Sequence, residues 1–313
     1  MIKEVSEALD FLDSPNVNGA AVVARVQGAG PVEASWRTIP GERGSTDFVR
    51  FFFPGTSGKS SGGSSPTLGI IGRLGGIGAR PQVIGLVSDG DGAVTAVACA
   101  LKLAAMAAAG DRLPGDVIIT THICPDAPTE PHEPVPFMGS PVDMRTMNAH
   151  EVDPAMDAIL TVDTTRGNRI INQRGFAVSP TVKEGYILRV SEDLLTIMQI
   201  VTGRAPAVFA ITTQDITPYG NGVYHLNSIL QPATATAAPV VGVALTTETA
   251  VPGSASGASQ FADIEAAARF CIEVAKAYGA GRCSFYDANE YRRLLSLYGA
   301  LRHFQTRGRS DNE

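Results

Sequence analysis

The sequence is poor in charge. Charged residues make up 18% of the 313 positions, below the roughly 25% that is usual for soluble domains. Acidic residues outnumber basic ones by 31 to 25, which gives a formal net charge of −6. A surface that binds nucleic acid needs an excess of positive charge, so we expect no nucleic-acid partner. Hydrophobic residues reach 44%, which argues against a disordered chain.

Cysteine is scarce, with four residues in the whole chain. Their spacing matches neither a zinc-binding nor a paired-cysteine motif. Two of them, Cys99 and Cys271, fall within apolar helical patterns that are typical of buried side chains. The first residues lack the apolar segment of a secretory signal. We therefore expect a cytoplasmic protein with reduced thiols.

Long hydrophobic runs are also rare. The best candidate for a membrane span is residues 93–109, but this stretch contains Lys102 and is short for a span. The pattern instead indicates a buried core helix, and we expect no contact with a membrane.

What the chain does contain is an alternation of strand and helix patterns. Strands are predicted at 19–26, 46–53, 68–71, 83–87, 116–123, 158–163, 208–213 and 239–245, and helices at 1–14, 93–109, 193–202 and 263–278. This alternation is typical of an α/β protein with a mainly parallel sheet covered on both faces. We expect one catalytic-type domain over residues 1–313. It comprises N-terminal strands and a Gly/Ser-rich loop (1–66), a core (67–280) and a C-terminal helical segment (281–313).

Polar side chains gather where these predicted strands end, which is where α/β sheets bind their ligands. In chain order they are Asp89, His122, Cys124, Asp126, His132, Glu133, Asp163, Tyr219, Asn221 and His225. Carboxylates together with imidazoles suit a divalent metal ion. Taken singly, Asp89 is better explained as a helix cap and Asp163 as part of a turn. Several such residues on one rim favour a site.

Two segments resemble a known enzyme family. The unit GLVSDGDGAVTAVACALKLAAM, followed by GDRLPGDVIITTHI, resembles the co-catalytic di-zinc aminopeptidases and carboxypeptidases, especially the tetrahedral aminopeptidases. The string AILTVDTT resembles the later strand of that family whose terminal Asp binds one metal. The resemblance covers roughly residues 45–280. It implies a zinc-exopeptidase-like, three-layer α/β/α fold with a mainly parallel mixed sheet, and it implies Asp89 and Asp163 as metal ligands.

The whole chain is more similar still to an uncharacterised bacterial and archaeal family of about 300 residues, a domain of unknown function. The strings that carry this similarity are GRLGGIGARP, THICP with PHEPVPFM, DTTRGN, SPTVKEGYILRVSEDL and QDITPYGNGVYHLNSILQPATAT.

The chain departs from the peptidase pattern at several ligand positions. Arg73 follows the strand at 68–71, where the first metal-binding His of that family would stand. The Glu pair that holds the general base is replaced near Asp126, and the first His after residue 245 is His303. An arginine would repel a dication and could instead neutralise the carboxylates. The standard two-zinc site therefore does not carry over.

Three functions remain open. The first is a hydrolase of a small amide, peptide or lactam that depends on zinc or manganese. Its ligands would come from Asp89, Asp163, Asp126, His122 and His132, and Glu133 would activate water as the general base.

The second function is a metal-free enzyme in which Arg73 and Arg80 hold a substrate carboxylate. There Cys124 would be the nucleophile, with His122 or His132 as its base. The third is a non-catalytic binding protein of peptidase fold. Tyr219, Asn221 and His225 are the candidate substrate-binding residues.

Two geometric expectations follow. Asp89, Asp163 and segment 122–133 should line one cleft, and Arg73 should point into it and pair with Asp89, Asp163 or a bound anion. The partner is expected to be a small-molecule or peptide substrate. A homo-oligomer is also expected, because the apolar run at 51–53 could form a subunit contact.

Overall fold

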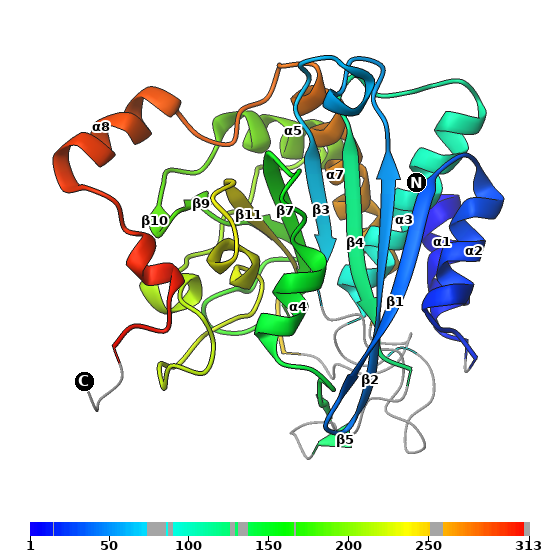
Figure 1. Ribbon diagram of the computed structural model, residues 1–313, viewed down its shortest axis with the longest axis horizontal. Helices are drawn as coiled ribbons and strands as arrows, with labels where there is room; N and C mark the ends of the chain where they lie inside the picture. Colours follow the sequence, from blue (N-terminus) through cyan, green and yellow to red (C-terminus); the bar gives the residue numbers. More distant parts are fainter. Residues whose placement is uncertain are drawn as a thin grey trace.

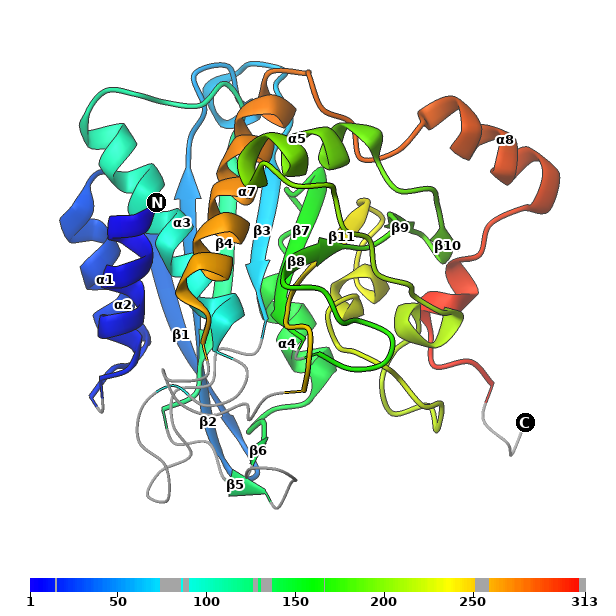
Figure 2. The same ribbon diagram turned by 180° about the vertical axis from the view of Figure 1, so that it is seen from behind.

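The computed structural model describes residues 1–14, 16–73, 86, 90–125, 129–130, 137–165, 167–250 and 259–309. It has the predicted three-layer α/β/α architecture, with a mixed sheet between two layers of helices (Figures 1 and 2). The centre of the sheet is parallel and both margins are antiparallel.

The main sheet has nine strands. In spatial order they are β1 (Glu33–Gly41), β2 (Gly44–Phe53), β4 (Val117–Ile123), β3 (Leu68–Gly72), β7 (Ala158–Thr164), β11 (Val240–Thr246), β9 (Val182–Lys183) and β10 (Tyr186–Ile187), while β8 (Gly175–Val178) pairs with β11. The parallel pairs are β4–β3, β3–β7 and β7–β11. A separate two-stranded sheet joins β5 (Thr129–Glu130) to β6 (Phe137–Met138).

One face of the sheet is covered by a layer of helices (Figure 2). They are α1 (Ile2–Leu12), α2 (Gly19–Ala29), α3 (Asp91–Ala108), α5 (Glu192–Thr202) and α7 (Phe261–Gly279). Because successive strand residues point to opposite faces, Ile70, Ile119 and Leu160 join the core beneath these helices.

The other face is covered by α4 (Met144–Glu151) and by short 3₁₀ turns (Figure 1). These turns are η2 (Thr213–Ile216), η3 (Gln231–Thr234) and η4 (Arg302–Gln305), and a further turn, η1, spans Lys59–Ser61. A second apolar core, which includes Ile71, Ile118 and Ile159, lies on this face. Helix α8 (Ala288–Tyr298) extends from the body of the molecule, at the left of Figure 1.

Helix α3 is the central element of the helical layer. Within the part of the chain that the structure describes, it alone is long and apolar enough to cross a membrane, and 78% of it is buried inside the fold. It contacts α1, α2 and α7 as well as β3, β4 and β7. Its Cys99, like Cys271 on α7, is fully buried. The predicted core helix at 93–109 is therefore confirmed, and it provides the crossover between the parallel strands β3 and β4.

Two predicted strands are wrong. Residues 19–26 belong to α2, whose Asn18 cap accepts a hydrogen bond from the Ala21 amide at 2.9 Å. The valines that suggested a strand lie on the buried side of this helix. Residues 208–213 form only an isolated bridge at Val208, and η2 begins at Thr213. There the reciprocal bonds between Thr212 and Asp215 favour a tight turn over an extended chain.

Other expectations have different outcomes. The strand expected at 83–87 lies outside the described residues except for Leu86. Helix α8 lies within the C-terminal segment that was expected to be helical, whereas strand β1 and helix α4 were not predicted. Phe51 and Phe53 are buried in the chain's own core, so these two side chains are not available for a subunit contact. The homo-oligomer itself stays a prediction.

Glycine sets how closely α3 approaches the sheet. A β-carbon on Gly92, in the first turn of α3, would lie 2.4 Å from the Arg73 carbonyl oxygen and 2.6 Å from that of Val162. We expect Gly92→Ala to destabilise the protein by about 1–3 kcal/mol, because the overpacking outweighs the gain in helix propensity.

The matched control is Gly28→Ala in α2, where a β-carbon would meet nothing within 4 Å. It should stabilise the protein by about 0.5–1 kcal/mol. Denaturant unfolding of both variants measures the two effects, and equal stability changes of the same sign would contradict the proposed close contact.

Candidate functional site

Three polar side chains lie side by side at the carboxyl ends of the central strands. Gly72 at the end of β3 is in register with Thr121 of β4 and with Val162 of β7. One residue further along, Arg73 therefore lies between His122 and Asp163. Since alternate residues share a face and neighbouring strands are about 4.8 Å apart, these side chains form a polar row. The row points to the α4 face, opposite the face covered by α3.

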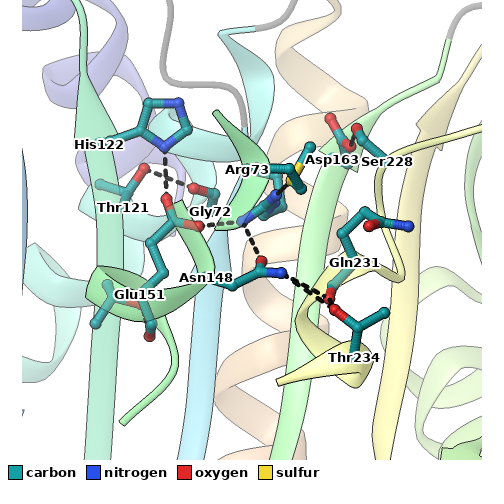
Figure 3. Close-up of polar contacts among 12 residues, drawn as sticks. Gly72, Arg73, Thr121, His122, Asn148, Glu151, Asp163, Ser228, Gln231 and Thr234 are labelled. Atoms are coloured by element: carbon teal, nitrogen blue, oxygen red, sulfur yellow. Dashed lines mark hydrogen bonds and ion pairs between the residues drawn. The ribbon is translucent and has the colours of Figure 1, made fainter. Parts of the chain in front are cut away.

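Helix α4 brings two further side chains to this row. Asn148 and Glu151 are three residues apart, so they lie on the same side of the helix. Glu151 is fully buried, pairs with Arg73 Nη1 and lies 2.5 Å from His122 Nδ1 (Figure 3). Asn148 accepts a hydrogen bond from Arg73 Nη1 at 3.3 Å and donates one to the carbonyl of Gln231 at 3.0 Å.

The charges of this cluster support one another. Burial alone would raise the pKa of the Glu151 carboxyl, but the positive charge of Arg73 and the contact with His122 outweigh burial and hold this pKa below its ordinary value. Glu151 is therefore a carboxylate at neutral pH. Arg73, which is fully buried, has its balancing charge within direct contact.

Asp163 behaves differently from Glu151. Burial raises the pKa of its carboxyl to about 6, although hydrogen bonds and the nearby positive charge of Arg73 act in the opposite direction. Those hydrogen bonds come from the Ser228 hydroxyl at 2.9 Å and the Thr164 amide at 2.7 Å. Asp163 thus exchanges a proton close to neutral pH, which is a property typical of catalytic carboxyls.

Two nitrogen atoms of the polar row have no partner among the described residues. They are Arg73 Nε and His122 Nε2, and both are buried. A buried polar group left unpaired costs about 1–3 kcal/mol, so such atoms are uncommon unless a ligand or substrate uses them. His122 retains a free ring nitrogen while Glu151 holds the other one.

The described residues do not form a metal site. In the part of the chain that the structure describes, no three His, Cys, Asp or Glu side chains are grouped so as to hold a metal ion. His122 and Asp163 lie on strands separated by β3, and the cationic Arg73 stands between them. Four predicted ligand or catalytic residues, Asp89, Asp126, His132 and Glu133, and the predicted anion-binding Arg80 lie outside the described residues. Their roles stay predictions.

The structure weighs against Cys124 as a nucleophile. Its side chain is fully buried, and its Sγ atom lies 3.5 Å from the Thr46 hydroxyl. Burial raises the pKa of this thiol to about 12. The thiolate is the reactive form of cysteine, and it is almost absent at neutral pH under these conditions.

The three predicted substrate-binding residues lie together in the loop after η2. The edge of the Tyr219 ring meets His225 with 4.4 Å between ring centroids, and both Asn221 and His225 contact Thr217. Of the three, only Tyr219 lines a cavity of about 540 Å³ beside α4. Burial and the negative charge of Asp163 raise the pKa of Tyr219, so its ring joins this cavity to the polar row.

The strand residues of this site were predicted from the sequence, but their partners from the opposite layer were not. Arg73 was expected to pair with Asp89, Asp163 or an anion, and its partner is Glu151. Asn148, Glu151, Ser228 and Gln231 were not singled out. A sequence signal for α4 does exist, since Asp143 caps its first turn by accepting from the Thr146 amide at 2.7 Å.

The buried ion pair can be tested by removing each charge in turn. Arg73→Met and Glu151→Gln each leave the opposite charge buried without its partner, so each should lower the free energy of unfolding by about 3–5 kcal/mol. The double variant should lose less than the sum of the two, because neither unpaired charge remains.

The control for this cycle is Arg50→Met, which breaks the half-exposed pair of Arg50 with Asp153. Its cost should be about 1 kcal/mol or less. Guanidinium unfolding measures all four variants, and strict additivity of the two buried substitutions would contradict the coupling.

The raised pKa of Asp163 predicts a pH dependence of stability. The folded chain holds the Asp163 proton more tightly than the unfolded chain, whose carboxyl titrates near 3.8, so wild-type stability is lost as pH rises from about 4 to about 6. The Asp163→Asn variant has no carboxyl at this position, so it should not lose stability in this way as pH rises. Its stability relative to the wild type should improve by roughly 3 kcal/mol between pH 4 and pH 7. Urea unfolding at both pH values provides the measurement, and a pH-independent difference would refute the assignment.

The overall arrangement is similar to that of solved enzymes of very different sequence. A glutaminyl cyclase from Porphyromonas gingivalis is 10% identical with a TM-score of 0.46, and the match covers 87% of this chain and 95% of that one. A glutaminyl cyclase from an Acidobacteriales bacterium is 11% identical with a TM-score of 0.48, covering 90% and 94%. A mutant of tomato leucine aminopeptidase is 10% identical with a TM-score of 0.45, covering 85% of this chain and 61% of that one. These likenesses concern the fold alone.

No curated protein matches the sequence. A protein family does match, over residues 37–308, and this family is described as a protein of unknown function (DUF1177). The match spans most of the chain and confirms the predicted similarity to an uncharacterised family. The chain therefore belongs to the DUF1177 family.

Proposed function

We propose that the protein is a hydrolase that cleaves the C–N bond of a small amide, peptide or lactam, with the polar row as its acid–base centre. The observation that carries this proposal is the placement of Asp163 and His122 on either side of Arg73, on one face of the sheet at its carboxyl edge. Amide hydrolysis needs a base for water, a positive charge for the developing oxyanion and an acid for the leaving nitrogen. The three side chains supply one of each.

Asp163 is the base in this proposal. A general base works best when its pKa is close to the working pH, and burial brings the pKa of this carboxyl to about 6. At neutral pH most of it is ionised and able to accept a proton from water. Its bond from the Ser228 hydroxyl fixes the orientation of one carboxylate oxygen.

Arg73 supplies the positive charge. Glu151, Asn148 and Met144 hold the two terminal nitrogens of its guanidinium, while Nε has no partner among the described residues. The free N–H can donate to a substrate carbonyl oxygen. A donor that is held in place before the reaction stabilises the transition state without the cost of reorganisation.

His122 is the acid. The carboxylate of Glu151 at Nδ1 orients the ring, and the buried Nε2, which has no partner among the described residues, is the atom that would deliver the proton. In the reaction the water oxygen bonds to the carbonyl carbon and its proton passes to Asp163. The C–N bond then breaks, and the nitrogen takes the proton of His122. Loss of the Asp163 proton and reprotonation of His122 from solvent restore the starting state.

A metal-dependent hydrolase is the second candidate. The feature that favours it is again His122, because metal-binding histidines commonly offer one ring nitrogen to the ion and the other to a carboxylate. Here Glu151 occupies Nδ1 and leaves Nε2 free. Zinc or manganese would then need Asp89, Asp126 or Asp163 as further ligands, as the sequence analysis predicts.

A screen of small amides, acylated dipeptides and lactams tests the proposal. Asp163→Asn and His122→Gln should each reduce kcat by at least about 100-fold. The value of kcat/KM should rise with pH through about 6, because Asp163 must lose its proton to act as a base.

Cys124→Ala is the discriminating variant and should retain activity, since the pKa of about 12 leaves almost no reactive thiolate at neutral pH. Its inactivation in a folded protein would support the cysteine mechanism instead. Loss of activity on dialysis against a chelator, with recovery on adding zinc or manganese, would favour the metal-dependent enzyme. Activity retained by Asp163→Asn would refute the role of Asp163.

A further inference from the structure

A cavity of about 540 Å³ lies beside the polar row, on the α4 side of the sheet. Its wall comes from three parts of the chain: α4 with its cap Asp143, residues between Pro218 and Ala235, and the C-terminal residues Gln305 and Arg307. Its volume falls within the range of small-molecule sites. Asn148 belongs both to this wall and to the hydrogen-bond network of Arg73.

Two arginines of the cavity wall have no ion-pair partner among the described residues. Arg145 and Arg307 both line the cavity, and neither forms an ion pair with any described residue. The one carboxylate in the wall, Asp143, is engaged at the start of α4, where it accepts from the Thr146 amide. The hydrogen bonds that it accepts from Thr146 and the charges of both arginines lower the pKa of Asp143. The cavity therefore carries more positive than negative charge.

Three other polar side chains of the wall, those of Asn148, Gln231 and Gln305, donate hydrogen bonds within the protein. Asn148 donates to the Gln231 carbonyl and to the Thr234 hydroxyl. Gln231 donates to the Thr217 carbonyl at 2.9 Å, and Gln305 donates to the carbonyls of Ala233 and Thr236. These contacts tie the C-terminal segment to the wall and leave the guanidinium groups of Arg145 and Arg307 as its unpaired donors.

We propose that this cavity binds a carboxylate through Arg145 and Arg307, so that the substrate of the proposed hydrolase is a small acidic amide or acylated peptide. The assignment of a substrate rests on the proposed function. The binding of an anion in this cavity does not depend on it. Guanidinium groups bind carboxylates with charge-assisted hydrogen bonds. Tyr219 lines the same cavity and reaches the surroundings of Asp163 and Ser228, so a substrate anchored by its carboxylate would lie along this ring toward the polar row.

A matched pair of probes tests the site, and each titration is made both in the wild type and in the Asp163→Asn background, where the probes should not be hydrolysed. N-acetyl-alanyl-alanine and its C-terminal amide differ in one negative charge and little in shape. In calorimetric titrations the acid should bind at least about tenfold more tightly than the amide, which is the effect of one charge-assisted contact. Arg145→Gln and Arg307→Gln should each remove most of this preference and leave the affinity for the amide unchanged.

Arg282→Gln is the control variant, because Arg282 is also exposed and does not line the cavity. It should bind both probes as the wild type does. Equal binding of acid and amide by the wild type, or an unchanged preference in both cavity variants, would overturn the inference. Thermal unfolding shows whether each variant remains folded.

The same variants separate the inference from the proposed function. Asp163→Asn should still bind the acid while turnover is lost. If the wild type binds the acid through the two arginines but hydrolyses no amide, the anion site stands and the proposed hydrolase fails. If neutral amides are hydrolysed equally well by the wild type and the arginine variants, the hydrolase stands and the carboxylate site fails.

Discussion

The charge of Arg73 is the constraint on which the rest of the site depends. A guanidinium at the centre of a covered sheet is stable only with a carboxylate in contact, because an uncompensated buried charge costs several kcal/mol. Glu151 provides that carboxylate and lies on a helix of the opposite layer. Docking of α4 on the sheet therefore brings the charge that compensates the burial of Arg73.

The same ion pair determines what its neighbours can do. Glu151 divides its two oxygens between Arg73 and His122, which fixes the histidine ring and leaves Nε2 free. Asp163 lies on the other side of Arg73 without a full counter-charge, so burial dominates its pKa. The carboxylate in contact with Arg73 and His122 stays ionised, whereas the other becomes a proton carrier. Two carboxyls within one network thus acquire different chemistry from their surroundings.

Asn148 extends this network beyond the sheet. Through its amide the position of Arg73 is connected to Gln231, to the 3₁₀ turn η3 and, by way of Gln305, to the C-terminal segment. The cavity wall and the polar row therefore share a hydrogen-bond framework. On the functions proposed above, one part of this framework recognises a charged group while the other carries out the proton transfers.

Local pattern was enough to predict most of the framework of the fold. The core helix α3 and the strands β2, β3, β4, β7 and β11 were predicted correctly. Their formation depends on hydrophobic periodicity and residue composition within a short stretch of sequence. The same logic placed Arg73, His122 and Asp163 at strand ends. It failed at α2, where a capping residue outweighs a run of valines, and it did not find α4. The partnership of Glu151 with Arg73 joins residues 78 positions apart. Only the packing of a helix across the sheet creates this contact. The protonation state of a buried group depends on such neighbours, which are distant in the sequence and cannot be read from a local pattern.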